Sequence, residues 1–259
     1  MTALDFPPVM LLHGLTGMPS MLRPLVRTLE THGIDTHTPV IAGHATSIDE
    51  LSKTTLSQWI ASVEEPFKAL TDSRGPIVVG GISLGGLLSL ELSLRHPDRV
   101  LGAILLSTPL DLPIWLKTTF FCVNSSPARY VYKGQRRSDK GIADPLGRKE
   151  FECYDYFPFK SIQNLFALRA QVLRRLDTLR IPVLMIHSIG DKTVPYSSVS
   201  VMKRHYTGPS LEIVTLEKSQ HVITLDLERA QVARSCLDFI RRLAAAPTPD
   251  RRTDDPSAI

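Results

Sequence analysis

The sequence predicts an α/β fold in which a mostly parallel sheet is flanked by helices. Short apolar runs typical of buried strands alternate with segments of helical periodicity, and nearly every strand-like run ends in a polar or glycine-containing loop. The chain of 259 residues with 43% hydrophobic content is long enough for one sizeable core. We therefore expect one domain that carries an insertion.

The first part of the chain alternates strands and helices without interruption. Pro19 and Ser20 begin the first helix, His32 ends it, and Pro97 ends the third. Residues 1–110 therefore form the first part of the core. The expected strands are 9–12, 35–39, 77–79 and 100–106, and the expected helices are 19–30, 56–70 and 84–96.

The alternation breaks down between residues 111 and 178. This segment combines most of the aromatic residues with repeated prolines and glycines, and long structureless loops are seldom so aromatic. We expect a cap insertion over the top of the sheet, whose last part forms a helix over 161–176. The aromatic residues are Trp115, Phe120, Phe121, Tyr130, Tyr132, Phe151, Tyr154, Tyr156, Phe157 and Phe159.

After the insertion the alternation resumes. Strands are expected at 181–187 and 211–216, and a helix over 227–243 closes the fold. The core would thus comprise residues 1–110 and 179–243. Residues 244–259 are rich in Pro, Asp, Arg, Thr and Ser, so we expect a disordered tail there.

A G-x-S-x-G pattern, Gly81-Ile82-Ser83-Leu84-Gly85, lies between a predicted strand and a predicted helix. A serine on so sharp a turn takes a strained backbone conformation, and the flanking glycines lack the Cβ atoms that would collide with it. The following helix directs N–H groups and the positive end of its dipole at any oxyanion formed there. A glycine-rich packing turn is the alternative, but this position favours Ser83 as a nucleophile.

Three further polar loops also follow predicted strands. They hold His13–Gly17, Asp191 and His221. Because the carboxyl ends of parallel strands meet at one edge of a sheet, these residues can meet Ser83 although they are distant in the chain. The order Ser, Asp, His, with the acid after a strand and the histidine after the last strand, is that of a hydrolase triad.

The chain resembles the α/β-hydrolase superfamily over nearly its whole length, and more narrowly its small bacterial carboxylesterases and monoacylglycerol lipases. The resemblance rests on His13–Gly17, the elbow Gly81–Gly86, the acid loop Asp191–Pro195 and the histidine loop Ser219–Asp226, of which the last is the most specific. Two features depart from the family. Gln220 stands where a glycine usually precedes the histidine, and the short N-terminal segment leaves the antiparallel edge strands reduced or missing.

The resemblance implies an α/β-hydrolase fold and a serine hydrolase that cleaves short to medium acyl esters and monoacylglycerols through an acyl-enzyme. Ser83 would attack the ester carbonyl, His221 would take its proton, and Asp191 would orient the imidazole and stabilise its cation. The backbone N–H groups of Leu15 and Leu84 would bind the oxyanion.

The substrate pocket is expected to be closed and apolar, with room for one acyl chain. Trp115 and Phe120 of the cap, together with Val222 beside the histidine, are expected to line it. A thioesterase, lactonase or C–C hydrolase on the same triad is the alternative within the enzyme class. A catalytically inactive hydrolase fold that acts as a binding protein is the alternative from another class.

Four other residues could compete for roles in the site. Asp111 also follows a strand and could be the acid, but the loop of Asp191 matches the family better. His187 is expected to fix a strand-end loop by hydrogen bonding, and His13 and His44 to brace backbone. No pair of histidines or carboxylates has metal-ligand spacing on a helix, so we expect no metal and no other cofactor.

The composition limits which partners and which cellular compartment are expected. The net charge of +4 is mild, and no basic cluster alternates with aromatic residues as a nucleic-acid groove requires. The basic excess of the cap is expected to form a solvated face; the alternative is that it attracts anionic esters or gives weak contact with a membrane surface. Cys122, Cys153 and Cys236 are too scattered for a disulfide framework. With no bilayer-length apolar run and no signal-peptide pattern, a cytoplasmic protein is expected.

Overall fold

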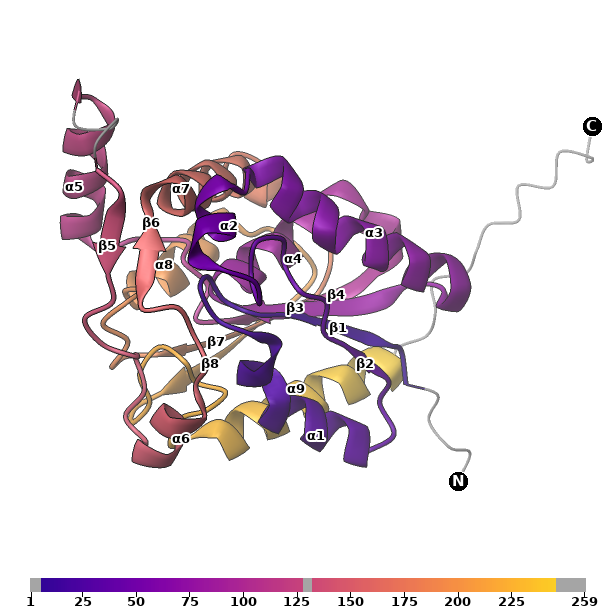
Figure 1. Ribbon diagram of the computed structural model, residues 1–259. Coiled ribbons are helices and arrows are strands. Elements are labelled where there is room, and N and C mark those ends of the chain that lie inside the picture. The colour runs from indigo at the N-terminus through magenta and orange to yellow at the C-terminus, as the bar shows by residue number, and fades with distance from the viewer. Residues whose placement is uncertain (1–5, 128–131, 246–259) are drawn as a thin grey trace, which may run out of the picture.

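The computed structural model describes residues 6–127 and 132–245, and its centre is a six-stranded sheet (Figure 1). The strand order is β2-β1-β3-β4-β7-β8, and every neighbouring pair is parallel. This confirms the predicted fold class. The strands are β1 (Val9–Leu12), β2 (Thr36–His37), β3 (Ile77–Ile82), β4 (Val100–Leu106), β7 (Val183–Ser188) and β8 (Leu211–Leu216).

Helices cover both faces of the sheet. On one face lie α1 (Arg23–Thr31), which follows the short helix η1 (Pro19–Leu22), and α9 (Arg229–Ala245) (Figure 1). The other face carries α3 (Leu56–Arg74), α4 (Leu84–Arg95), α7 (Phe159–Leu173) and α8 (Ser197–His205). The parallel sheet is therefore enclosed between two helical layers, as such sheets require.

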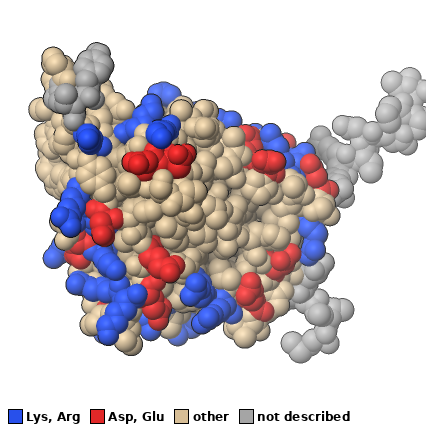
Figure 2. Space-filling model, viewed as in Figure 1, with Lys and Arg blue, Asp and Glu red and all other residues tan. Residues whose placement is uncertain are grey.

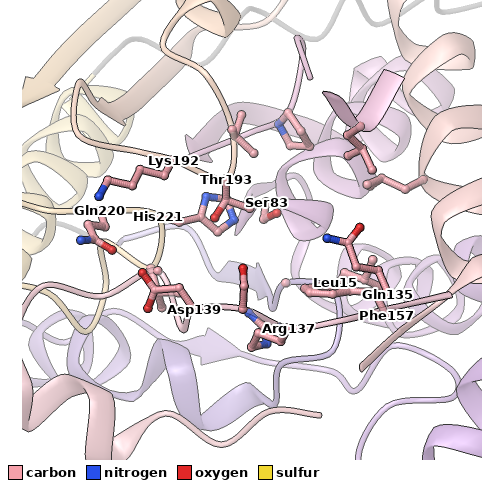
Figure 3. Close-up of a pocket in the computed structure, with 18 of the residues that line it drawn as sticks. Leu15, Ser83, Gln135, Arg137, Asp139, Phe157, Lys192, Thr193, Gln220 and His221 are labelled. Atoms are coloured by element: carbon pink, nitrogen blue, oxygen red, sulfur yellow. The ribbon is translucent and has the colours of Figure 1, made fainter. Parts of the chain in front are cut away.

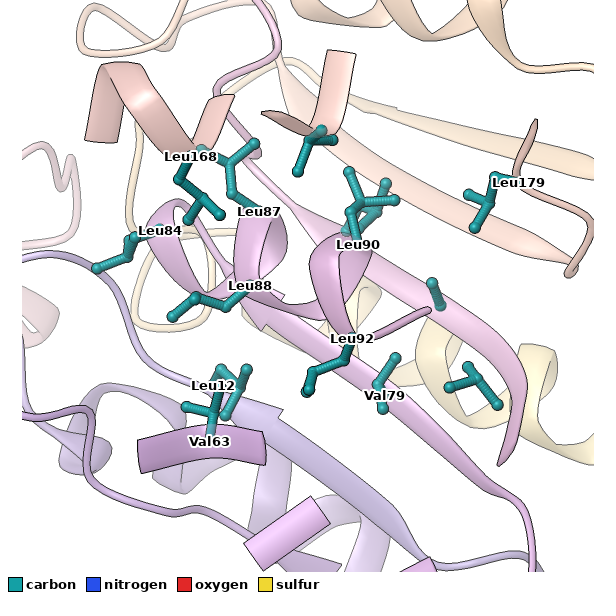
Figure 4. Close-up of a cluster of buried hydrophobic side chains, with 14 of the residues drawn as sticks. Leu12, Val63, Val79, Leu84, Leu87, Leu88, Leu90, Leu92, Leu168 and Leu179 are labelled. Carbon is teal, nitrogen blue, oxygen red and sulfur yellow. The ribbon is translucent and has the colours of Figure 1, made fainter. Parts of the chain in front are cut away.

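The four inner strands β1, β3, β4 and β7 are mostly apolar on both sides because both of their faces are buried. Met10 and Leu12 of β1 belong to the apolar cluster beneath α3 and α4, whereas Val9 and Leu11 belong to the cluster beneath α1 and α9. In the first cluster, leucines of α4 meet side chains from β1, α3 and α7 (Figure 4). Because α4 is buried on almost every side and mostly apolar, it is held at the centre of the molecule.

The described residues 111–127 and 132–158 of the predicted cap lie beyond the carboxyl ends of the strands (Figure 1). An antiparallel pair, in which Gly134 lies opposite Pro158, is its only sheet among the described residues. Its last helix, α7, also packs on α4 and contributes Leu168 and Val172 to the core. The cap elements before α7 are α5 (Ile114–Asn124), β5 (Gly134–Arg136), α6 (Pro145–Glu150) and β6 (Tyr156–Pro158), and η4 (Leu176–Thr178) follows it.

Most predicted elements have counterparts in the structure. Three strands have the predicted bounds, namely 9–12, 100–106 and 211–216. The strand predicted at 35–39 is only two residues long in the structure. The sequence did not predict α5, α6, α8, α2 (Ile48–Lys53) or η2 (Pro97–Arg99). Of the expected tail, residues 244 and 245 end α9, and 246–259 lie outside the described residues.

The turn between β3 and α4 is as sharp as the glycines predict. Ser83 has φ 55° and ψ −115°, a conformation that L-residues rarely adopt. A Cβ atom on Gly85 would lie 2.0 Å from the carbonyl oxygen of Leu12, and one on Gly81 would lie 2.5 Å from the carbonyl carbon of Gly85. The two glycines therefore allow β1 and the start of α4 to approach closely enough to hold Ser83 in this conformation.

Candidate active site

The structure places three chain-distant residues around one cavity at the carboxyl edge of the sheet. Ser83 caps the N-terminus of α4, Asp191 follows β7, and His221 follows β8. Ser83 and His221 both line a cavity of about 270 Å³ and are drawn in it in Figure 3. The sheet topology thus brings the predicted residues to the same edge.

Asp191 and His221 form a buried hydrogen-bonded pair. The Nδ1 of His221 lies 2.7 Å from Oδ2 of Asp191, while Oδ1 accepts the N–H groups of Thr193 and Val194 at 2.8 Å each. Burial alone would raise the pKa of Asp191, but the charge and hydrogen bond of His221 and the Val194 amide lower it below its ordinary value. The carboxylate is therefore charged at neutral pH and fixes a proton on Nδ1, which leaves Nε2 free to accept one.

Two backbone N–H groups beside the predicted nucleophile have no backbone acceptor among the described residues. That of Leu84 lies in the first turn of α4, where a helix has no backbone acceptor of its own. That of Leu15 donates to no acceptor among the residues that the structure describes. The loop residues Gly14 and Leu15 also line the cavity. An oxygen anion beside Ser83 could therefore receive hydrogen bonds from both loops.

Two neutral histidines fix the loop that holds Leu15. His44 Nε2 accepts the N–H of Thr16 at 3.1 Å, and His13 Nε2 accepts the N–H of Ile41 at 3.1 Å. Burial and the neighbouring His44 lower the pKa of His13 to about 3, and burial lowers that of His44 to about 4. Both imidazoles therefore stay neutral and accept hydrogen bonds, which agrees with the bracing role expected for them.

We expect these histidines to make the fold sensitive to mild acid. Because the pKa is lowered in the folded state, the unfolded chain binds protons that the folded chain does not bind. The free energy of unfolding therefore falls as the pH drops below about 6.5. Between about pH 7.5 and pH 5 each of His13 and His44 should cost about 2 kcal/mol of unfolding free energy. The carboxylates with lowered pKa values, Asp191 among them, lose their contribution mainly at lower pH.

Urea titrations at the two pH values would measure this loss. His44→Gln should reduce the difference between them by about 2 kcal/mol and leave the contributions of His13 and of His187, whose pKa burial also lowers. His205→Gln, at an exposed position, should leave the difference unchanged. An unfolding free energy that is equal at both pH values in the wild-type chain would contradict the assignment.

The loop that holds His221 is fixed by a carboxylate, Asp226, that the sequence analysis did not single out. The fully buried Asp226 accepts the N–H groups of Gln220, Leu227, Ala143 and Asp144 at 2.7 to 3.0 Å. It therefore joins the loop of His221 to the cap segment. The signal available in the sequence was its place at the end of the matched histidine loop.

The competing residues lie elsewhere or have other partners. Asp111 is bound to Lys117 at 2.6 Å and accepts the hydroxyl of Ser197 at 2.6 Å. His187 Nε2 lies 3.1 Å from the carbonyl oxygen of Val194, which agrees with the loop-fixing role expected for it. Asp191 is therefore the carboxylate that the structure brings to His221.

The cavity has an apolar part and a polar part. Of the residues expected in the pocket, Trp115 and Val222 line it, whereas Phe120 instead stacks on Phe166 with ring centroids 3.9 Å apart. The apolar lining also includes Leu112, Leu116, Phe151, Phe157, Ile162 and Leu165. The polar lining, which the sequence reasoning missed, includes Gln135, Arg136, Arg137, Ser138, Asp139, Lys192, Thr193 and Gln220 (Figure 3).

The described residues contain neither a metal-binding cluster nor a membrane-spanning helix. No group of three or more His, Cys, Asp or Glu side chains among residues 6–127 and 132–245 could hold a metal ion. Over the same residues, the helices are all too short or too polar to cross a bilayer.

Known proteins resemble this chain over most of its length. The family model of serine aminopeptidase S33, Hydrolase_4, matches residues 7–228. A thermostable monoacylglycerol lipase of Bacillus sp. (strain H-257) is 30% identical over 238 residues, which cover 91% of each chain. A carboxylesterase of Bacillus subtilis (strain 168) is 29% identical, and the match covers 91% of this chain and 92% of that one.

Solved structures share the fold. A lipolytic enzyme from the metagenome-derived LipS and LipT pair superimposes with a TM-score of 0.79 at 24% identity, covering 93% of this chain and 99% of that one. A soluble variant of the monoglyceride lipase of Saccharomyces cerevisiae gives a TM-score of 0.75 at 17% identity, covering 95% and 88%.

Proposed function

Because the chain belongs to the serine aminopeptidase S33 family of α/β hydrolases, we propose that Ser83, His221 and Asp191 cleave carboxylic esters through an acyl-enzyme. The observation that carries this proposal is one cavity in which a serine at a strained strand-to-helix turn meets a histidine bound to a buried carboxylate. The activity is that of a carboxylesterase or monoacylglycerol lipase, as the relatives' names suggest.

In the first half of the reaction Ser83 attacks the ester carbonyl. Its hydroxyl is a weak nucleophile at neutral pH, so His221 Nε2 takes the proton as the bond forms. Asp191 holds the proton on Nδ1 and stabilises the imidazolium. The N–H groups of Leu15 and Leu84 bind the oxygen that becomes negative, and the proton on Nε2 then passes to the leaving alcohol.

In the second half a water molecule replaces the alcohol. His221 takes a proton from this water as it attacks the acyl-enzyme, and the same two N–H groups bind the second oxyanion. When the tetrahedral intermediate collapses, the proton returns to Ser83 and the acid leaves. The apolar lining around Trp115 and Leu165 would hold the acyl chain during both halves.

The size of the cavity bears on the substrate. A cavity of about 270 Å³ has room for one acyl chain, and each methylene buried in it contributes up to about 0.8 kcal/mol, or roughly fourfold in kcat/KM. We therefore expect kcat/KM for p-nitrophenyl esters to rise with chain length until the cavity is full and then to fall. Monoacylglycerols of matching chain length should also be cleaved.

The test is a rate profile over p-nitrophenyl esters of increasing length, with monoacylglycerols and emulsified triacylglycerols in parallel. Little action on the emulsion is expected. A rate on long-chain triacylglycerol that jumps when the emulsion forms would contradict the single-chain cavity. Cleavage of thioesters or lactones in preference to matched esters would instead favour the alternative chemistry on the same triad.

Contact of the cap with a membrane surface is a separate part of the proposal. The helix α5 has no buried residue, and Ile114 and Phe121 on it are 73% and 70% exposed. Such exposed apolar side chains support weak contact with a lipid surface.

A further inference from the structure

The charged side chains around the cavity are mostly positive. Arg136, Arg137 and Lys192 line it, and the one carboxylate that lines it with them is Asp139. Asp139 lies 3.8 Å from Arg148, so its charge is partly compensated from outside the cavity. In the view of Figure 3, Lys192 lies to the left of His221, and Arg137 lies below Ser83 and His221. The described lining therefore carries an excess of positive charge around the reacting serine.

Arg137 has no anionic partner in the part of the chain that the structure describes. Its Nε donates to the carbonyl oxygen of Tyr154 at 3.3 Å, an Nη2 donates to the hydroxyl of Thr16, and no carboxylate lies within ion-pair distance. The guanidinium lies over the rings of Phe157 and Phe151, with its carbon 4.5 Å and 5.6 Å from their centroids. Asp155 and Asp139 are near enough to raise the pKa of Arg137, but neither pairs with it directly. Among the described residues the guanidinium is thus held in a fixed place with no carboxylate in contact.

This arrangement is unusual for a half-buried arginine. Withdrawing a charge from water is unfavourable unless an opposite charge compensates it. Burial lowers the pKa of Arg137 for this reason, but the arginine keeps its charge at neutral pH. Other half-buried side chains of this type in the chain do have partners. Arg169 lies 4.0 Å from Asp111, and Arg175 lies 2.5 Å from Glu91.

We propose that the cavity accepts esters that carry an anionic group such as a carboxylate, with Arg137 as its principal counter-ion and Arg136 and Lys192 as supporting charges. The proposal rests on the ester hydrolysis proposed above and adds a substrate class to it. The aromatic faces of Phe151 and Phe157 hold the guanidinium in place, so binding an anion would cost little side-chain entropy. The apolar lining would still hold the carbon chain of such a substrate.

Matched ester pairs separate charge from size. On the acyl side, mono(4-nitrophenyl) adipate is compared with the ester in which a carboxamide replaces its free carboxylate. On the alcohol side, 4-butyryloxybenzoate is compared with 4-butyryloxybenzamide. For at least one pair, kcat/KM of the anionic ester should exceed that of its amide by roughly tenfold, and added salt should lower this ratio. The pair that responds shows on which side of the ester the anion lies.

Variants assign the effect to the cavity. Arg137→Gln keeps an N–H donor at the place of Nε, near Tyr154, but removes the charge and the donor to Thr16, and should bring the anion-to-amide ratio close to one. The double variant Arg136→Gln/Lys192→Gln changes two exposed side chains that the fold does not need, and should lower the ratio severalfold. Arg234→Gln, an exposed position on α9 outside the cavity lining, makes the same change in net charge as the first and should leave the ratio unchanged.

The outcomes distinguish this inference from the proposed function. If wild-type enzyme cleaves the amide esters and the anionic esters equally, ester hydrolysis stands and the anion subsite is wrong. If the anion-to-amide ratio is unchanged in both cavity variants, the anion subsite is also wrong. Arg137 is then a residue that only positions the loop of Thr16. If no ester of either kind is cleaved, it is the proposed function that fails.

Discussion

Replacing Ser83 with alanine should lower kcat for p-nitrophenyl butyrate by roughly 10⁶-fold, and His221→Ala should do the same. The reason is that nucleophile and base act as one unit, so that losing either leaves only binding and the oxyanion donors. Neither change should unfold the chain, because alanine removes a single oxygen at the elbow and a largely buried ring from the edge of the cavity. Circular dichroism and a urea titration would check this.

Two controls make the result specific. Ser73→Ala in the last turn of α3 and His205→Gln at the exposed end of α8 change the same residue types away from the cavity, and both should keep wild-type activity. A fluorophosphonate should label the wild-type chain at Ser83 and leave the Ser83→Ala chain unlabelled. A folded Ser83→Ala protein that keeps near wild-type esterase activity would refute the nucleophile assignment and favour a binding protein.

Asp191→Asn should lower kcat by about 10⁴-fold, a larger effect than any change at Asp111. Because Oδ1 already accepts two backbone N–H groups, an asparagine would keep its oxygen there and turn its amide nitrogen toward His221. The imidazole would then have to accept at Nδ1 and carry its proton on Nε2. In that tautomer it cannot take the proton of Ser83.

Asp111→Asn is the matched comparison. It removes the ion pair with Lys117 but leaves the surroundings of His221 unchanged, so the loss of kcat should stay within about tenfold. Measuring kcat for both variants on the same ester, with folding checked for each, decides between the two acids. A larger loss for Asp111→Asn would mean that the roles are reversed.

Strands and catalytic order could be predicted because their signals are local. Apolar runs such as Val9–Leu12 and Val100–Leu106 are buried on both faces, so their sequence alone marks them as strands of a parallel sheet. In contrast, α8 begins Ser-Ser-Val-Ser-Val, which has low helix propensity. Its helix depends on tertiary packing, since Val199 and Met202 are buried against the core.

The polar side of the cavity could not be predicted for a different reason. Arg137 resembles the neighbouring basic residues of the cap in the sequence, where a solvated face was expected. Its burial arises from Thr16, which is 121 residues away, and from the aromatic rings around it. The same holds for Phe120, whose stacking on Phe166 is a contact between α5 and α7 that no local pattern shows.

Two of the hydrogen-bonded contacts between the cap segment and the core differ in what they require of the cap sequence. Asp226 binds the main chain of residues 143 and 144, and any residue except proline offers that N–H group. The hydroxyl of Thr16, however, receives its hydrogen bond from the side chain of Arg137. The hydrogen bonds to Asp226 therefore place little demand on the side chains at 143 and 144 in a cap transplanted from another hydrolase, whereas the bond to Thr16 requires an arginine at the place of Arg137. Substitutions in the cap should therefore be tolerated more readily at residues 143 and 144 than at Arg137.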